Sequence, residues 1–286
     1  MMRKILAWIL GCAGLAGCSD TPDIQQPLVP VSEAVPSRAE GTVRVATFNV
    51  AFFRDEPGAL IADLELGNHP RAEAIRAIIN SVDPDILVIN EIDYDEEGRA
   101  INLFANALGT DYDFRLALPS NTGVASWTDL DNDGRSDHAP GTGNYGNDSF
   151  GYGQFPGQYA FAVISRYPID EAAVRTFQKL LWRDLPNNLM PTDFYSDDAQ
   201  EVFRLSSKNH AVVPINVGEN TLHMVLAHPT PPGFDGPEDR NGRRNNDEIR
   251  LLMEMVAAPD ANWLVDDAGQ QGGLPPGSAF VLAGDL

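Results

Sequence analysis

Four apolar runs along the chain each end on a polar side chain of a type that binds metals or phosphates. Runs of this length with many β-branched residues predict β-strands. Because each strand delivers its polar residue at the same kind of position, the pattern suggests one polar site on a sheet edge. The runs are Val43–Asn49, Ile86–Glu91, Leu222–His228 and Ala279–Leu286, and the polar residues are Asn49, Glu91, His228 and Asp285.

The segments between these runs predict further strands and a few helices. A long polar stretch, residues 119–158, predicts a loop, and a loop of that length is usually functional or held by a ligand. Mixed strands with a few helices fit an α+β fold or a layered α/β sandwich. Helical spacing of apolar residues predicts helices over Arg71–Asn80, Asn102–Leu108 and Asn245–Ala257. Strands are predicted over Tyr159–Ser165 and Ala173–Phe177, with a hairpin of His210–Val217 and Thr221–His228.

The first residues have the pattern of an export signal. Two basic residues precede the apolar run Ile5–Leu10, which is too short for a membrane span. Leu15–Cys18 resembles a bacterial lipobox, so residues 1–17 are predicted to be a lipoprotein signal peptide and Cys18 the acylated anchor. An ordinary secretory signal is the alternative. Residues 18–40 are predicted to be a flexible linker and 41–286 the folded domain, giving an extracytoplasmic bacterial lipoprotein.

The charge balance is strongly acidic, with a net charge of −21 at pH 7. Proteins that grip nucleic acid through its phosphates normally show a basic face, so nucleic acid is possible but not favoured as a partner. Such an acidic balance indicates a solvated surface, and some of the carboxylates are candidates to hold divalent metal. Once Cys12 leaves with the signal and Cys18 carries lipid, no thiol remains for a disulfide or a nucleophile. A monomer is expected.

The polar strand ends lie within longer motifs that together resemble a known family. The motifs are Thr47–Val50, Pro84–Glu91, Ala160–Ile169, Ala227–Pro229 and Ala283–Asp285. In their order and spacing they resemble the endonuclease/exonuclease/phosphatase family, the deoxyribonuclease-I-like superfamily, over residues 43–286. The resemblance implies a four-layered α/β sandwich, with two mixed β-sheets packed face to face and helices outside. It also implies divalent-metal hydrolysis of phosphate esters at one end of the sandwich.

The resemblance also implies a role for each of the four polar residues. Glu91 would be the principal ligand of Mg²⁺ or Mn²⁺, with Asn49 beside it contacting the metal, its water or the phosphate. His228 would hydrogen-bond the scissile phosphate, with a further role as general acid left open. Asp285 would orient or deprotonate the attacking water. Oxygen ligands suit Mg²⁺, and a metal with nearby donors stabilises charge that develops on a phosphoryl group.

The end of the sequence departs from the family pattern. The family's Asp is followed by any residue and then Asn, and a Ser-Asp-His type segment closes its domain, whereas this sequence stops at Leu286. Ser136-Asp137-His138 matches that tripeptide but lies in the long loop, so we interpret it as a coincidence. We therefore expect a C-terminally truncated record, with the last strands missing and sheet edges unpaired. The chain as written is expected to be inactive or severely impaired.

A second candidate metal site lies inside the long loop. Asp129, Asp131, Asp133 and Asp137, with Gly134 at the sharp turn, reproduce the front of a Ca²⁺-binding loop. Its twelfth position is Pro140, so the bidentate Glu of an EF-hand is missing. We predict a structural Ca²⁺ that orders residues 119–158. The alternative is an Asx-rich turn with solvated charges.

Two weaker candidates for contacting the substrate phosphate are His210, at a strand start, and Arg243, in a small basic cluster. The leading hypothesis is a secreted, lipid-anchored phosphoesterase that uses divalent metal on phosphodiesters or phosphomonoesters. A small phosphorylated substrate or a phospholipid headgroup is mildly favoured. The alternatives are a non-catalytic Ca²⁺-binding surface module on the same fold and a secreted nuclease.

Overall fold

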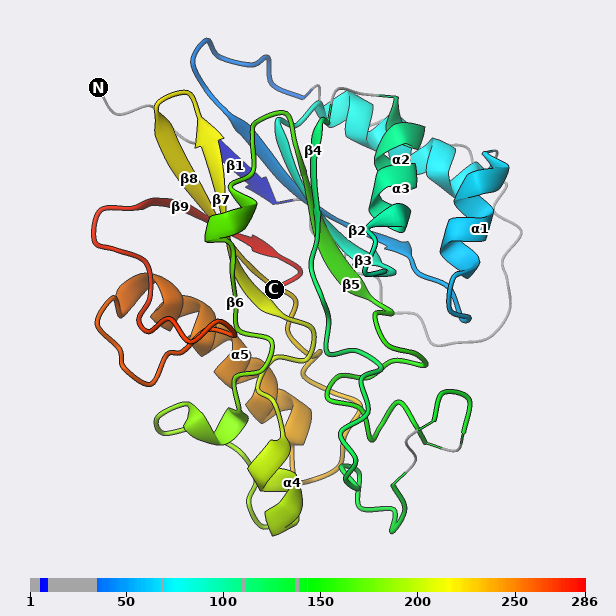
Figure 1. Cartoon of the computed structure of the whole chain (residues 1–286), viewed down its shortest axis with the longest axis vertical. Coiled ribbons are helices and arrows are strands. Elements are labelled where there is room, and N and C mark those ends of the chain that lie inside the picture. The colour runs from blue at the N-terminus through cyan, green and yellow to red at the C-terminus, as the bar shows by residue number, and fades with distance from the viewer. Residues whose placement is uncertain (1–5, 10–34, 68, 110–111, 137–138, 143) are drawn as a thin grey trace.

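Two mixed β-sheets form the centre of the protein (Figure 1). The computed structural model describes residues 6–9, 35–67, 69–109, 112–136, 139–142 and 144–286. One sheet has the order β1 (Leu6–Ile9), β2 (Arg44–Phe52), β3 (Ile86–Ile92), β5 (Ala160–Ser165), β4 (Phe114–Ala117). The other has the order β6 (Arg175–Thr176), β7 (His210–Val217), β8 (Asn220–Ala227), β9 (Ala279–Gly284). Each sheet contains both parallel and antiparallel pairs of strands. β2 runs parallel to β3 and β8 runs parallel to β9, whereas the pairs β3–β5 and β7–β8 are antiparallel.

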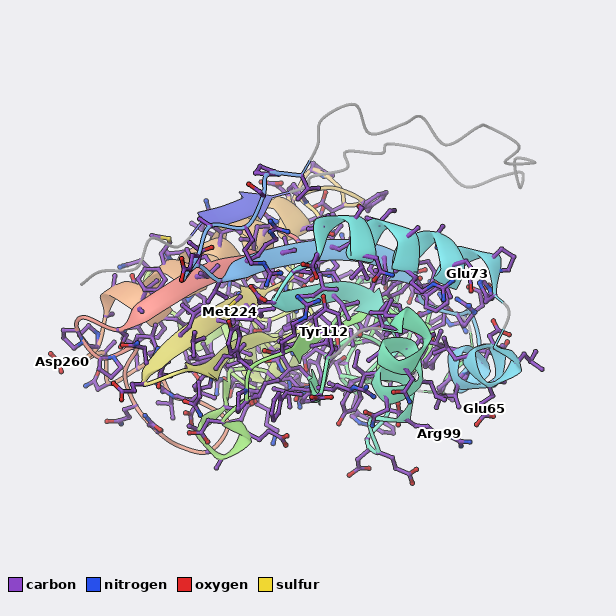
Figure 2. The ribbon with its side chains drawn as sticks, turned by 90° about the horizontal axis from the view of Figure 1, so that it is seen from above. Glu65, Glu73, Arg99, Tyr112, Met224 and Asp260 are labelled. Carbon is purple, nitrogen blue, oxygen red and sulfur yellow. The ribbon has the colours of Figure 1, made fainter. Side chains whose placement is uncertain are left out.

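The alternation of side chains along β3 explains why the layers stack. Ile86 and Val88 face the second sheet, while Leu87 and Ile89 face the helices on the other side. The inter-sheet core also takes Val213 of β7, which is fully buried. Such a strand, apolar on both faces, is typical of a parallel sheet covered on both sides. Figure 2 shows Met224 inside the molecule, whereas Glu73 points outward.

Helices cover the outer face of each sheet and complete four layers. The first sheet carries α1 (Ala59–Leu66), α2 (Pro70–Val82) and α3 (Arg99–Leu108). The second carries α5 (Arg240–Ala257), whose Leu251, Leu252 and Met255 are buried against it. The short helix α4 (Asp197–Val202) and two 3₁₀ turns, Glu171–Ala173 and Trp182–Asp184, lie in the connections. The predicted α+β sandwich with two mixed sheets and outer helices is therefore confirmed.

The predicted elements are mostly present, with shifted boundaries. The hairpin is confirmed as β7 and β8. The predicted helix at Asn245 begins earlier, at Arg240, and the predicted strand Ala173–Phe177 is only the two-residue β6. The helix α1 and the strand β4 were not predicted. Their segments carry no clear apolar period, so packing against neighbours decides their structure.

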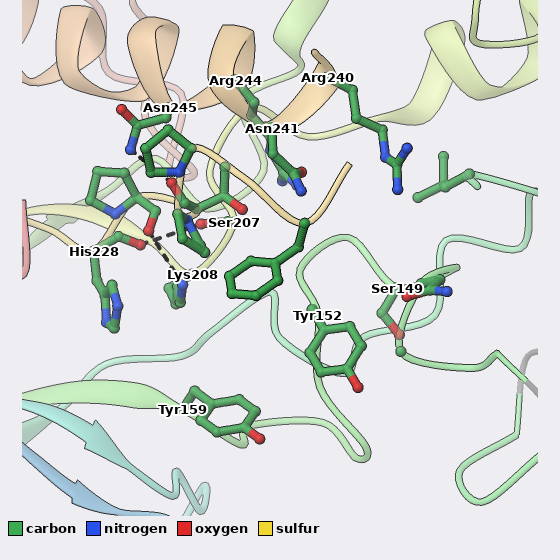
Figure 3. A pocket seen from close by; sticks show the side chains of 18 of the residues that line it. Ser149, Tyr152, Tyr159, Ser207, Lys208, His228, Arg240, Asn241, Arg244 and Asn245 are labelled. Carbon is green, nitrogen blue, oxygen red and sulfur yellow. Dashed lines mark hydrogen bonds between the residues drawn. The ribbon is translucent and has the colours of Figure 1, made fainter. Parts of the chain in front are cut away.

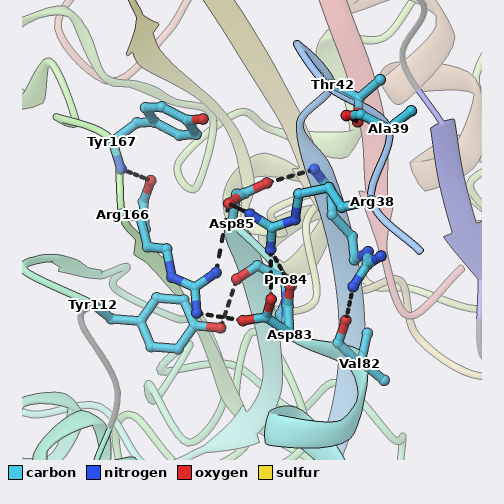
Figure 4. Close-up of polar contacts among 12 residues, drawn as sticks. Arg38, Ala39, Thr42, Val82, Asp83, Pro84, Asp85, Tyr112, Arg166 and Tyr167 are labelled. Atoms are coloured by element: carbon cyan, nitrogen blue, oxygen red, sulfur yellow. Dashed lines mark hydrogen bonds and ion pairs between the residues drawn. The ribbon is translucent and has the colours of Figure 1, made fainter. Parts of the chain in front are cut away.

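The amino-terminal approach to the domain is fastened by ion pairs (Figure 4). Arg38 donates to Asp85 at 2.7 Å and to Asp83 at 2.8 Å, and Arg166 also pairs with Asp83. The side chain of Asp85 is 3% exposed and accepts a further hydrogen bond from Arg44 N. The last residues of the predicted linker, Arg38 among them, are therefore bound to the domain.

The predicted signal peptide lies largely outside the described residues, and so does Cys18. Within residues 1–17 only the strand β1 is described, and it runs parallel to β2. Among the described helices, none combines the length and apolar character needed to cross a membrane.

The long polar loop is packed onto the domain. Asn121, which has no exposed surface, donates hydrogen bonds to Gln178 O and Ser206 O, both at 2.7 Å. Gly151 approaches the chain so closely that a Cβ there would lie 1.8 Å from Ser207 O. Only glycine fits at such an approach. The loop is thus fixed against the segment that leads into β7.

Candidate active site

The four polar residues predicted at strand ends meet at one end of the sandwich. Asn49 lies on β2, Glu91 on β3, and His228 and Asp285 directly follow β8 and β9. Because β2 and β3 are parallel, and so are β8 and β9, each pair delivers its residues at the same edge. The structure therefore brings together residues that lie up to 236 positions apart in the sequence.

Irregularities in β2 and β3 aim Glu91 into the site. The register of the β2–β3 pair shifts between Asn49 and Phe52, and that of β3–β5 shifts between Asn90 and Ile92. Glu91 sits at the shift with a φ of 59°, a conformation uncommon for residues other than glycine. Such bulges re-aim a side chain and are frequent next to active sites. Glu91 is partly exposed here, between neighbours that are buried.

Hydrogen bonds across the two sheets fix the positions of these side chains. Asn49 Nδ2 donates to Asp285 Oδ2 at 2.7 Å, and Thr47 Oγ1 donates to Gly284 O at 2.9 Å. Gly284 has a φ of 147°, and a Cβ there would lie 1.7 Å from Ala227 O. The last strand can therefore dock beside β8 only with glycine before Asp285.

His228 lies deeper in the site than the two carboxylates. Its Nε2 is 3.7 Å from Asp285 Oδ2, and its Nδ1 is buried without a hydrogen-bond partner among the described residues. Burial, with the nearby Lys208 ammonium as a second cause, lowers the pKa of His228 well below its ordinary value. A neutral imidazole has one N–H donor and one lone pair, so it suits a hydrogen bond to a phosphate oxygen.

A buried carboxylate behind the site holds the segments that carry Lys208 and His228. Glu248 on α5 has no exposed surface, and its Oε1 accepts hydrogen bonds from Ser207 N at 2.7 Å and Ser207 Oγ at 3.0 Å. Its Oε2 accepts one from Thr230 N at 2.8 Å. Burial lowers the pKa of Lys208, while the neighbouring Glu248 and Glu91 act in the opposite direction. Lys208 is the buried cation of the site.

Sequence reasoning missed Lys208 and Glu248. Glu248 occupies a helix that was predicted from its apolar spacing alone, and only the tertiary packing of α5 shows that this carboxylate is buried. The one usable signal was the polar run Ser206–Asn209 directly before an apolar strand. Polar groups in that position need internal partners once the strand is buried.

A pocket of about 780 Å³ opens from these residues toward the start of α5 (Figure 3). Glu91, Lys208, His228 and Asp285 lie along one part of its lining. Figure 3 shows Tyr152 and Tyr159 on the side of the pocket opposite α5. Tyr159 packs against Phe53 with ring centroids 4.4 Å apart and the ring planes tilted by 57°. Burial raises the pKa of Tyr159 to about 12, so its hydroxyl stays protonated.

Neither of the two weaker predicted phosphate contacts, His210 and Arg243, is supported. His210 is fully buried, with Nδ1 2.8 Å from Ser206 Oγ and Nε2 2.8 Å from Glu248 O. Both ring nitrogens are thus occupied inside the fold. Arg243 does not line the pocket, whereas its neighbour Arg244 does. A helix turns about 100° per residue, so adjacent residues face different directions.

The acidic loop forms a cluster that differs from the predicted one. Carboxylate oxygens of Asp129, Asp131 and Asp148 lie within 4.8 Å of one another, and Asp129 Oδ1 is buried without a hydrogen-bond partner among the described residues. Asp133 instead accepts a hydrogen bond from Asn144 at 2.6 Å. Asp133 is not among the three carboxylates of this cluster. Asp137 lies outside the described residues. Local spacing could not reveal Asp148, which reaches the cluster from the far side of the loop.

Comparison with known proteins agrees with this geometry. The family model described as "Endonuclease/Exonuclease/phosphatase family" matches residues 46–286. The chain belongs to this family. Its members are divalent-metal-dependent enzymes that act on phosphate esters, nucleic acids among them. No curated protein sequence matches this chain.

Several solved structures resemble the chain at low identity. An endonuclease/exonuclease/phosphatase from Beutenbergia cavernae is 16% identical, with a TM-score of 0.42, over 78% of this chain and 47% of that one. Sphingomyelinase C from Streptomyces griseocarneus is 19% identical, with a TM-score of 0.40, over 85% and 63%. TDP2 from Caenorhabditis elegans is 14% identical, with a TM-score of 0.36, over 85% and 47%. The chain thus spans between about half and two thirds of the length of these structures.

The residues at the strand ends fit the divalent ion that the family uses. Ligand atoms of Glu91, His228 and Asp285 lie within 4.8 Å of one another, close enough to surround one ion. Two carboxylates supply the oxygen ligands that Mg²⁺ and Mn²⁺ prefer. Glu91 and Asp285 are therefore suited to hold an ion at this edge, with Asn49 holding the Asp285 carboxylate in place.

Proposed function

We propose that this protein is a divalent-metal-dependent phosphoesterase that hydrolyses phosphodiester or phosphomonoester bonds by attack of water. The observation that carries the proposal is the convergence of Glu91, His228 and Asp285 within 4.8 Å, where all four predicted strand ends meet. A pocket of about 780 Å³ at this point has room for a phosphate ester. Family membership supports the same class of reaction.

Each side chain has a distinct task in the proposed reaction. Glu91 holds the ion, which when bound polarises the phosphoryl oxygen. Asp285, oriented by Asn49 at 2.7 Å, positions the attacking water and accepts its proton. The neutral His228 donates its N–H to a phosphate oxygen, and Lys208 balances negative charge from the pocket lining. Glu248 keeps the segments of Lys208 and His228 in register.

Hydrolysis of simple esters by the protein together with any residues that its gene encodes after Leu286 tests the proposal, because the chain as written is expected to be inactive or severely impaired. We expect release of p-nitrophenol from bis(p-nitrophenyl) phosphate or p-nitrophenyl phosphate with Mg²⁺ or Mn²⁺, abolished by chelation. Glu91→Gln keeps the size of the side chain and removes its charge, and should lower kcat/KM by about 100-fold or more, as for loss of a group that stabilises the transition state. Metal-dependent rates that are equal in the wild type and Glu91→Gln would rule out the proposed site.

A parallel plasmid-nicking assay distinguishes a small-ester hydrolase from a nuclease. The net charge of −21 favours small esters, because it repels a polyanion. We also propose that the protein is exported and attached to a bacterial membrane through lipid on Cys18. The lipobox-like sequence Leu15–Cys18 supports this location.

A further inference from the structure

The outer part of the pocket is rimmed by two exposed aromatic side chains. Tyr152 is 58% exposed and Phe234 is 90% exposed, and both line the pocket that contains Glu91 and His228. They come from different segments, the long polar loop and the connection between β8 and α5. Large exposed apolar side chains at the mouth of a cavity are typical of sites that contact a ligand.

The position of Phe234 is fixed by the first turns of α5. Asn241 Nδ2 donates to Gly233 O and Asn241 N donates to Asp235 Oδ2, both at 2.6 Å, so the residues on either side of Phe234 are held. Phe234 itself has a φ of 63°. A left-handed backbone is unfavourable for a bulky residue, and so is exposure of a phenyl ring. The fold therefore holds this ring in the open against two local preferences.

The cations along the outer pocket are already engaged. Arg244 donates to Leu205 O, Phe150 O and Arg204 O at 2.6–3.0 Å. Arg240 pairs with Glu238 and lies over the Phe194 ring, 5.2 Å from its centroid. Of the pocket-lining cations in the described part of the chain, only Lys208 lies next to the catalytic carboxylates. The residues at the strand ends can thus bind one phosphate. The described cations at the rim are engaged elsewhere and leave no partner for a second anionic group on the substrate.

We propose that Tyr152 and Phe234 bind a flat, uncharged aromatic group on the phosphate ester, so that the preferred substrates are esters with one phosphate and an aromatic organic part. This inference rests on the proposed function, because the phosphate is taken to bind at Glu91, His228 and Asp285. Aromatic side chains interact with planar groups by stacking or edge-on contact. Tyr159, whose ring packs against that of Phe53, lines the same pocket.

Binding and turnover are measured separately, so that the two proposals can fail independently. Isothermal titration calorimetry with Mg²⁺ compares phenylphosphonate and methylphosphonate, whose P–C bonds are not cleaved by ester hydrolysis. Kinetics compare three diesters with the same p-nitrophenol leaving group and a second ester group that is p-nitrophenyl, methyl or choline. The proteins are the wild type, Tyr152→Ala and Phe234→Ala. Tyr152→Phe keeps the ring, and Trp127→Ala removes an exposed aromatic that is not among the pocket-lining residues.

We expect phenylphosphonate to bind the wild type more tightly than methylphosphonate. Each alanine variant should reduce that preference by about 3- to 10-fold, the size of one aromatic contact. KM for the bis-aryl diester should rise in the same proportion. Tyr152→Phe should retain the preference of the wild type, and so should Trp127→Ala.

Other outcomes overturn one proposal or the other. Equal affinity for the phenyl and methyl compounds, or a preference that survives both alanine variants, would refute the aromatic rim. Loss of binding to phosphatidylcholine vesicles in Phe234→Ala, with the phenyl preference intact, would refute it in favour of a lipid-surface contact. Rim-dependent binding of phenylphosphonate without metal-dependent hydrolysis of any ester would uphold the rim and overturn the proposed function.

Discussion

Several side chains of the pocket stand on backbone that only glycine adopts easily. Glu91, Tyr159 and Phe234 have φ values of 59°, 56° and 63°. A left-handed backbone conformation costs about 1 kcal/mol or more for each residue other than glycine. It persists only where the surrounding structure holds the residue in it. The bulge in β3 fixes the backbone conformation of Glu91. The hydrogen bonds of Asn241 to the neighbours of Phe234 fix the backbone conformation of Phe234. These three are among the nine described non-glycine residues with positive φ, and the surroundings of the candidate site hold them there.

At the same scale, His210 makes the stability of the fold depend on pH. Burial lowers the pKa of His210 below its ordinary value of 6.5, so the ring stays neutral in the folded state. Below pH 6.5 the unfolded chain binds a proton there that the folded chain does not, so stability falls as pH falls. For one proton, the loss in the free energy of unfolding approaches about 1.4 kcal/mol for each pH unit below 6.5.

Urea unfolding of the wild type and His210→Gln between pH 7.5 and 5 measures this effect. Glutamine keeps a donor and an acceptor but does not titrate, so the stability of the variant should fall less steeply. His228 also has a lowered pKa and contributes equally to both proteins. The difference between the two slopes therefore reports His210 alone. Parallel curves for the two proteins would show that His210 does not carry the effect.

At the scale of elements, the long loop is the part of the fold that the sequence describes least well. Its polar composition shows no periodic spacing of apolar residues that would predict how it packs. Asn121 and Gly151 nevertheless hold it against the segment before β7. Its metal motif pointed to local ligands, whereas the structure gathers Asp129 and Asp131 with Asp148 from the end of the loop. A contact between residues that are distant within a loop leaves no signature in local spacing.

The predicted Ca²⁺ can be tested on this loop. Calorimetric titration of the wild type with Ca²⁺ is expected to show binding, because three carboxylates this close repel one another without a cation. Asp131→Asn should weaken binding at least tenfold. Asp133→Asn should have a smaller effect, since Asp133 is not among the three carboxylates that lie within 4.8 Å of one another. Equal affinities in all three proteins, or no heat of binding, would favour a solvated Asx-rich turn.

The strands could be predicted better than the helices and loops, for a physical reason. A buried strand is apolar throughout, so the residue on which it ends is visible in the sequence, and Asn49, Glu91, His228 and Asp285 were found in this way. Lys208 and Glu248 were missed because their burial depends on how α5 packs against β7 and β8. His210 was misread because a polar residue at a strand start can face either a site or the core.

At the scale of the whole molecule, the proposed attachment of this acidic domain to a membrane is open to a direct test. Fractionation of cells that express the protein tests this attachment. The wild type is expected in the membrane fraction, because Cys18 is predicted to carry the lipid. Cys18→Ser should release the protein, while Ser19→Ala, which alters the neighbouring position, should not. A Cys18→Ser protein that stays with membranes would contradict the lipid anchor.

The hydrogen bonds Asn49–Asp285 and Thr47–Gly284 join residues 236 and 237 positions apart. Loop-closure entropy opposes such contacts early in folding, and they form once most of the intervening chain has condensed. The two sheets bring their halves of the site together only when β9 pairs with β8. On a growing polypeptide the site can therefore form only after residues 279–285 have been synthesised, so recovery of the proposed hydrolysis would follow the pairing of β9 with β8.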